Sequence, residues 1–175
     1  MSTAPAKIRV FAGEHFACIK IEGRANFTSS IDFRTLVNEL LQRNYRYFVL
    51  DLCECTLMDS TFLGVLAGFG LKGCVNKQTP GCITIEVLNP NERIMELLES
   101  LGVLHLFKVV RAPGQGCESA ESAALTPMAP TKEEVTRACL EAHQTLMELN
   151  PQNAAKFKEV AAFLAEDLKK TKTGP

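Results

Sequence analysis

The segment from Phe48 to Gly70 places the narrowest limits on how this chain folds. It opens with an apolar run interrupted only by Asp51, which is typical of a strand buried on both faces of a parallel sheet. It closes with residues 61 to 71, where no side chain is charged, so a helix there has little solvent-facing surface. The polar junction Asp59-Ser60-Thr61 lies between them, and in open α/β sheets ligands and partners bind at such strand-to-helix junctions.

This junction resembles the signature of STAS domains, the fold of bacterial anti-sigma factor antagonists. In that pattern a hydrophobic strand ends in Asp-Leu, and after a short connector Asp-Ser-Ser/Thr-Gly-Leu-Gly opens a helix. The chain has Asp51-Leu52 and then residues 59 to 64, with Phe62 at a position where glycine is common. Residues 88 to 107 also match the end of the pattern, and the resemblance covers roughly residues 6 to 111.

Ser60 occupies the position of the family's regulatory phosphoserine, so the resemblance implies phosphorylation there, with Thr61 as the alternative acceptor. It also implies binding to an anti-sigma factor or a related serine kinase, and dephosphorylation by a serine/threonine phosphatase. The N-terminus of a helix tolerates a phosphate well, because its dipole and free N–H groups favour an anion. Without the resemblance, Asp59 and Ser60 are most simply interpreted as N-cap residues, and the two interpretations are compatible.

The predicted partner-binding surface joins this junction to the loop before the first helix. The family often has an aspartate in that loop, where this chain has Asn26. Phe62 is interpreted either as an aromatic anchor for the partner or as a core residue, and the sequence leaves both open. The complete predicted set is Asn26, Phe27, Asp59, Ser60, Thr61, Phe62 and Leu63.

Hydrophobic periodicity and turn residues predict an α/β fold. We expect a STAS-like mixed sheet of four to five strands with parallel central strands, crossover helices and a C-terminal helical hairpin. The expected strands cover residues 8–11, 16–21, 47–53, 82–88 and 104–110, and the expected helices of the sheet domain cover 29–43, 61–71 and 89–102. Ser29 or Ser30 is the expected cap of the first helix, and Asn89-Pro90 the expected start of the third.

Three parts are expected along the chain: a STAS domain over 6–111, a flexible linker over 112–130 and a helical hairpin extension over 131–171. The hairpin begins with a capping box, Thr131 to Glu134, and breaks at Asn150-Pro151. Its apolar stripes need a cover, which is the STAS body, a second chain or another protein. We expect a docking or dimerisation element and favour self-association into a homodimer.

Composition excludes several classes of function. With 19 basic and 20 acidic residues and a net charge of −1, the chain has no basic excess for nucleic acid. The N-terminus lacks the apolar core of a signal peptide, and residues 62–71 are too short an apolar run to cross a bilayer, so we expect a cytoplasmic protein without membrane insertion. The seven cysteines lack metal-site spacing and are interpreted as reduced.

These patterns predict a regulatory protein rather than an enzyme, with no catalytic residue, no metal site and no cofactor. The alternative function is a STAS binding module, or a subunit of a lipid or anion transport system, that works without phosphorylation. Fold alone does not decide between these two functions.

Overall fold

The computed structural model describes residues 4–74, 82–112, 123–124 and 129–172. Its centre is a seven-stranded mixed sheet with the order β6-β5-β3-β2-β1-β7, in which β4 pairs with β2. Strands β2, β3, β5 and β6 are parallel, whereas β1 runs antiparallel to both β2 and β7. The strands are β1 (Lys7–Ala12), β2 (Phe16–Ala25), β3 (Tyr47–Asp51), β4 (Cys55–Met58), β5 (Thr84–Leu88), β6 (Lys108–Val110) and β7 (Ala123–Ala124).

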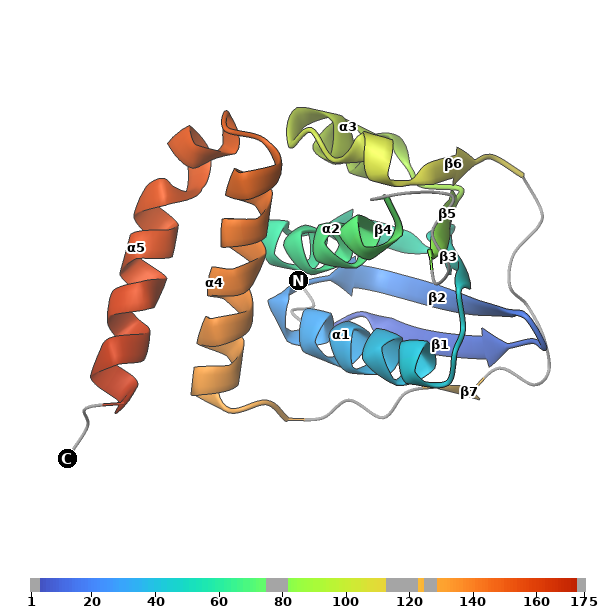
Figure 1. Cartoon of the computed structure of the whole chain (residues 1–175), viewed down its shortest axis with the longest axis horizontal. Helices are drawn as coiled ribbons and strands as arrows, with labels where there is room; N and C mark the ends of the chain where they lie inside the picture. The colour runs from blue at the N-terminus through green and yellow to red at the C-terminus, as the bar shows by residue number, and fades with distance from the viewer. Residues whose placement is uncertain (1–3, 75–81, 113–122, 125–128, 173–175) are drawn as a thin grey trace.

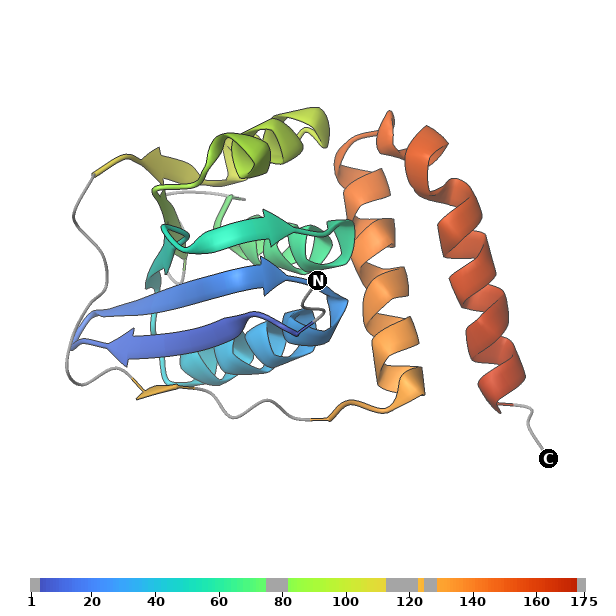
Figure 2. The ribbon, with the colours of Figure 1, turned by 180° about the vertical axis from the view of Figure 1, so that it is seen from behind.

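Helices α1 (Phe27–Gln42) and α2 (Ser60–Cys74) cover one face of the sheet, as Figures 1 and 2 show from opposite sides. Four phenylalanine rings pack between these layers. The ring centroids of Phe33 and Phe62 lie 5.1 Å apart, and those of Phe69 and Phe48 of β3 lie 4.9 Å apart. Parallel strands need crossover connections, and helices in those connections bury the strands' apolar side chains. The predicted α/β fold with parallel central strands and crossover helices is therefore confirmed.

Several predicted boundaries need correction. Helix α1 begins earlier than expected, because Asn26 rather than Ser29 or Ser30 is its N-cap. Helix α3 (Glu92–Ser100) is capped by Asn91, while Asn89 adopts a positive φ of 51° in the preceding turn. Only the end of the predicted last strand is extended, since a 3-10 turn, Leu104–Leu106, precedes β6.

Strands β4 and β7 were not predicted, so the sheet exceeds the expected four to five strands. Strand β4 lies in the segment expected to be a connector and pairs parallel with the end of β2. Strand β7 lies inside the predicted linker and pairs with Arg9 and Val10 of β1. The division of the chain into 6–111, 112–130 and 131–171 stays a prediction.

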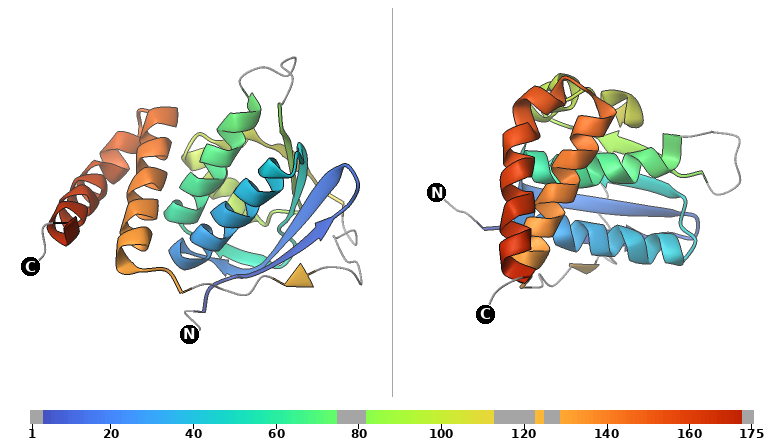
Figure 3. Two further views of the ribbon diagram at one scale, coloured as in Figure 1. Left: turned by 60° about the horizontal axis from the view of Figure 1, so that its bottom comes forward. Right: turned by 60° about the vertical axis from the view of Figure 1, so that its left-hand side comes forward.

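The last two helices, α4 (Lys132–Leu149) and α5 (Asn153–Lys172), form the predicted hairpin. Thr131 and Glu134 make the predicted capping box at the start of α4. Helix α4 lies between the body and α5, so α5 is the outermost element of the fold (Figures 1 and 3). Asn153 is fully buried and holds the corner of the hairpin, because its Nδ2 donates to Leu101 O at 2.9 Å and to Leu146 O at 2.8 Å.

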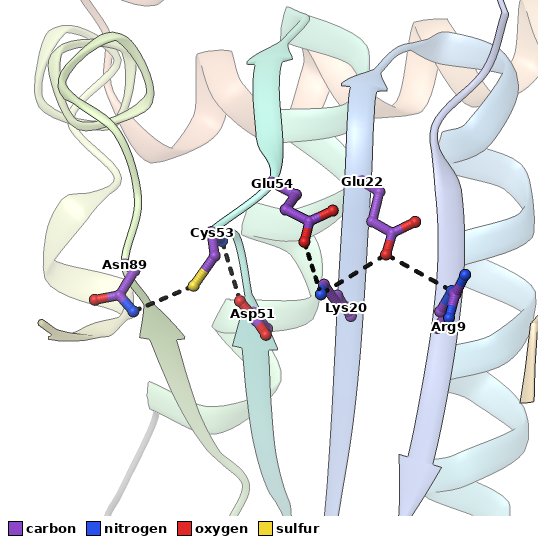
Figure 4. A network of polar contacts seen from close by, with 7 residues as sticks. All are labelled: Arg9, Lys20, Glu22, Asp51, Cys53, Glu54 and Asn89. Carbon is purple, nitrogen blue, oxygen red and sulfur yellow. Dashed lines mark hydrogen bonds and ion pairs between the residues drawn. The ribbon is translucent and has the colours of Figure 1, made fainter. Parts of the chain in front are cut away.

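The sheet face opposite α1 and α2 carries a network of charged and polar side chains (Figure 4). Lys20 Nζ contacts Glu54 at 3.1 Å and Glu22 at 3.7 Å, and Glu22 also pairs with Arg9. The hydrogen bond to Glu54 raises the pKa of Lys20, although burial opposes it. This network joins β1 and β2 to the loop after β3, and that loop leads through β4 to Ser60.

Among the described residues, no helix is long and apolar enough to span a membrane. Cys53, Cys55, Cys82 and Cys139 are free thiols, but Cys18 is disulfide-bonded. The expectation that all cysteines are reduced is therefore wrong for Cys18, which lies buried in β2.

Candidate functional site

Asp59 ties the N-termini of α1 and α2 together at the edge of the sheet where β2 and β4 end. Its Oδ1 accepts a hydrogen bond from Phe62 N at 2.8 Å, as an N-cap side chain does, and its Oδ2 accepts one from Phe27 N at 2.7 Å. Burial raises the pKa of the Asp59 carboxyl, while these backbone donors oppose the shift. One carboxylate therefore fixes how the two predicted parts of the surface lie beside each other.

Asn26 is the single residue between β2 and α1, and it caps α1 through a reciprocal capping box with Ser29. Its Oδ1 accepts from Ser29 N at 3.1 Å, and Ser29 Oγ accepts from Asn26 N at 3.0 Å. An asparagine is therefore sufficient as a cap at this position, and the following Phe27 remains 46% exposed.

The structure separates the predicted contact residues into two groups. Asn26, Phe27, Asp59 and Ser60 lie together at the strand-to-helix edge, as expected from their positions in the sequence. Phe62 and Leu63 are fully buried, and the Phe62 ring packs against Phe33. This burial agrees with the interpretation of Phe62 as a core residue, and contact of Phe62 or Leu63 with a partner stays a prediction.

Helix α4 covers the junction, which the sequence did not indicate. Ser60, the first residue of α2, is half-buried, and its Oγ lies 3.0 Å from His143 Nε2. His143 Nδ1 lies 2.6 Å from the carbonyl oxygen of Cys139, which can only accept, so Nδ1 carries the hydrogen. In the neutral imidazole, Nε2 is then an acceptor, and the Ser60 hydroxyl donates to it.

Two further contacts extend this cover along α2. Thr61 is only 5% exposed, and its Oγ1 lies 3.5 Å from Cys139 Sγ. A Cβ on Gly64 would lie 2.6 Å from the Cβ of Ala142, so the two helix backbones approach each other as closely as a glycine allows. The absence of charge from residues 61 to 71 now has a cause, because α2 is enclosed by the sheet, α1 and α4.

His143 is the residue of this site that sequence reasoning missed. It is 6% exposed, and its ring lies 4.9 Å from that of Phe157 on α5. A weak signal existed, since His143 follows Cys139 by four residues and so lies on the same face of α4 as part of the apolar stripe. Its hydrogen-bond partner Ser60 lies 83 positions earlier in the sequence and could not be predicted from that spacing.

Chemically, the site offers a hydroxyl, a carboxylate and an imidazole at the start of a helix. Among the described residues, no group of three or more His, Cys, Asp or Glu side chains is arranged to hold a metal ion. The N–H groups of the first turn of α2 are already engaged by Asp59, because Phe62 N donates to its Oδ1 and Leu63 N to its carbonyl oxygen.

Comparison with known proteins finds solved structures that are similar to this fold. No protein-family model and no curated protein matches the chain. An anti-sigma factor antagonist from Mycobacterium paratuberculosis has 12% identity and a TM-score of 0.51, covering 62% of this chain and 87% of that one. The unphosphorylated antagonist SpoIIAA gives 15% identity and a TM-score of 0.46, over 60% of this chain and 88% of that one. Phosphorylated SpoIIAA from Bacillus has 14% identity and a TM-score of 0.47, and the match covers 61% of this chain and 92% of that one.

At these levels of identity the likeness to the mycobacterial antagonist establishes the fold, which is STAS-like as the sequence predicted.

Proposed function

We propose that this chain is a protein-binding switch of the anti-sigma factor antagonist kind. Its Ser60 surface binds an anti-sigma factor or a related serine kinase, and phosphorylation of Ser60 by that partner ends the binding. A serine/threonine phosphatase removes the phosphate and restores the binding-competent form. The chain itself supplies no catalytic residue to this cycle.

The position of Ser60 carries the proposal. On a STAS-like fold, it is the first residue of α2 and follows Asp59, whose carboxylate binds the backbone N–H of the exposed Phe27. Phe27 thus offers an accessible aromatic side chain next to the phosphoacceptor, and aromatic residues contribute strongly to interface energies.

Electrostatics explains why a phosphate on Ser60 would release a partner. The group adds a charge of about −1.5 to −2 next to the carboxyl of Asp59. In a packed and partly apolar interface, such a charge costs several kcal/mol of desolvation unless a cation meets it. The same charge is tolerated when the site faces water, because the helix N-terminus then stabilises it.

Mass spectrometry of the protein isolated from its native cells tests this function. We expect a fraction of the chain to carry one phosphate, located on Ser60, and we expect a Ser60→Ala chain expressed in the same cells to carry none. Loss of the phosphate on treatment with a metal-dependent serine/threonine phosphatase is the matched control. A chain without phosphate in every growth condition sampled, or one phosphorylated elsewhere, would contradict the proposal.

One observation favours the alternative, a STAS binding module or transport-system subunit that works without phosphorylation. The Ser60 hydroxyl is half-buried and already bonded to His143, so this site is structurally satisfied without a phosphate. Co-purification of an unphosphorylated chain with a membrane permease from native cells would support this function. A phosphate on Ser60 would argue against it.

A further inference from the structure

The face of α2 that carries Ser60 already holds a helix, the chain's own α4. Three contacts follow one another along the two helices: Ser60 with His143, Thr61 with Cys139, and Gly64 with Ala142. These contacts begin at the proposed phosphoacceptor and continue through the first turns of α2. The part of the assigned surface that Ser60 and Thr61 form is therefore occupied by a segment of the same chain, while Phe27 stays exposed.

Small side chains make this surface suited to a helix. Gly64 has no side chain, and Ala142 faces it with a single methyl group, so the two backbones come into direct contact. Ala138 and Leu146 are buried on either side of Ala142, at the spacing of one helix face. An extended segment would lack this repeat, whereas any helix with small residues on one face would reproduce it.

We infer that the Ser60 surface is a helix-binding surface, and that α4 competes there with a helix of the binding partner. The partner helix would place small residues opposite Gly64 and a hydrogen-bond acceptor opposite Ser60, as α4 does with Ala142 and His143. The identity of that partner rests on the proposed function, but the occupation of the surface by α4 does not.

The contact between α4 and the body is close but leaves part of the groove between the helices unfilled. A cavity of about 160 Å³ remains between α1, α2 and α4, next to Gly68 and Thr145. The ion pair between Arg34 and Glu141 spans the same groove, but both side chains are nearly half exposed, and such pairs contribute little. A partner helix can therefore displace α4 only if it buries more apolar surface than α4 does through Ala138, Ala142 and Leu146, which are all buried.

A matched pair of glycine substitutions in the full-length chain tests this inference. Alanine at position 64 clashes with Ala142, whereas a Cβ at Gly68 meets only Thr145 Cγ2 at 3.9 Å, an ordinary contact. Both changes favour helix α2 itself, because alanine is a better helix former than glycine. Any difference between Gly64→Ala and Gly68→Ala therefore reports the contact with α4.

Native Cys139 is the reporter, since it lies on α4 under Thr61. Its alkylation by iodoacetamide is followed by peptide mass spectrometry, with exposed Cys53 as the rate reference. Buried Cys55, whose pKa is raised to about 11 by burial, checks that the body stays folded. We expect Gly64→Ala to raise the rate at Cys139 about tenfold through overpacking, and Gly68→Ala to leave it unchanged.

A cross-link gives a second measurement that does not depend on Gly64. In Thr61→Cys, the new thiol faces Cys139, and mild oxidation should join α2 to α4, while Thr61→Cys with Cys139→Ser should give no intrachain cross-link of this kind. Equal alkylation in both glycine variants, or no cross-link, would overturn the cover by α4 and leave the proposed function standing. A confirmed cover in a chain that never carries a phosphate on Ser60 would instead overturn only the function.

Discussion

Ser60 Oγ and His143 Nε2 lie 3.0 Å apart, although 83 positions of sequence separate the two residues. The contact joins the proposed phosphoacceptor on α2 to a buried side chain on α4. A phosphorylated Ser60 has no hydroxyl hydrogen to donate to His143, and it adds charge beside Asp59. We therefore expect phosphorylation of Ser60 to be coupled to the position of the hairpin.

The first prediction concerns the strength of this coupling. Replacing His143 with alanine removes its ring contact with Phe157, its hydrogen bond to Cys139 O within α4 and its hydrogen bond to Ser60, and the last of these contributes about 1 kcal/mol in a typical protein. Because that bond holds α4 over Ser60, we expect His143→Ala to raise the alkylation rate of Cys139 about fivefold. His105→Ala, a change at an exposed histidine on the body, is the matched control and should have no effect. Identical rates in the two variants would show that the hydrogen bond does not hold the helix.

Substitutions of Ser60 should separate binding from release. Ser60→Ala should bind the kinase partner permanently, because it cannot be phosphorylated, whereas Ser60→Asp should bind poorly. Binding isotherms with the purified partner would measure both, with Ser100→Ala, at an exposed serine of α3, as a control for general effects of removing a serine hydroxyl. If Ser60→Ala is still fully phosphorylated in vitro at Thr61, the assignment of Ser60 is wrong.

Two phenylalanines next to the site should behave in opposite ways. Phe62 is fully buried, so Phe62→Ala should lower the free energy of unfolding by about 3 to 5 kcal/mol through loss of packing. Phe27 is 46% exposed, so Phe27→Ala should change that free energy by no more than about 0.5 kcal/mol but should weaken partner binding. Denaturant titration and binding isotherms on both variants would measure the two effects. Unaltered partner binding by Phe27→Ala would remove this residue from the proposed surface.

The pH dependence of stability should carry opposite contributions from Asp59 and Glu86. Burial raises the pKa of Asp59 above 3.8, so the folded state holds the proton more tightly, and this contribution to stability falls as the pH rises through the folded-state pKa. The hydrogen bond from Tyr47 lowers the pKa of Glu86 below 4.5, so its contribution is lost as the pH falls through the folded-state pKa.

Denaturant titrations at several pH values between acid and neutral give the free energy of unfolding as a function of pH. The slope of this free energy against pH should change in opposite directions in Asp59→Asn and Glu86→Gln. Slope changes of the same sign in both variants would contradict the assignment of burial as the main influence on Asp59.

Self-association through the hairpin remains a proposal, now confined to the outer face of α5. Of the three covers considered for the hairpin, the structure shows the body beneath α4, while Phe163 and Val160 on α5 are 70% and 43% exposed. We expect light scattering to show a dimer that Phe163→Glu converts to a monomer. Phe16→Glu, at an exposed phenylalanine on β2, should leave the dimer intact. A full-length chain that is monomeric at high micromolar concentration would exclude this assembly.

The sequence predicted the parts of the fold in which local pattern and burial coincide. The apolar run of β3 lies buried between neighbouring strands, and the capping box at Thr131 begins α4 where expected. Short elements were missed because β4 and β7 depend on pairing with distant strands, which leaves almost no local signal. Asn26 was not recognised as a cap, because Ser29, its partner in the capping box, is itself a common N-cap residue.

For the site, the sequence placed Ser60 and Asp59 correctly at the start of α2, but it did not reveal their cover. An apolar stripe on α4 indicates that the helix is covered and does not indicate by what. The identity of the cover depends on the closeness of Gly64 and Ala142, which arises only when the two helices are packed in three dimensions.

The pairing of β7 with the outer edge of β1 sets how far the hairpin can move. With Ala124 held against Arg9, only residues 125–130 join the sheet to Thr131 at the start of α4. A tether of that length spans at most about 20 to 25 Å when fully extended. A displaced α4 therefore stays at an effective concentration in the millimolar range near α2. A partner helix must therefore bind tightly enough to displace an α4 that stays tethered near α2. Release of β7 from β1 would lower the affinity that the partner helix needs.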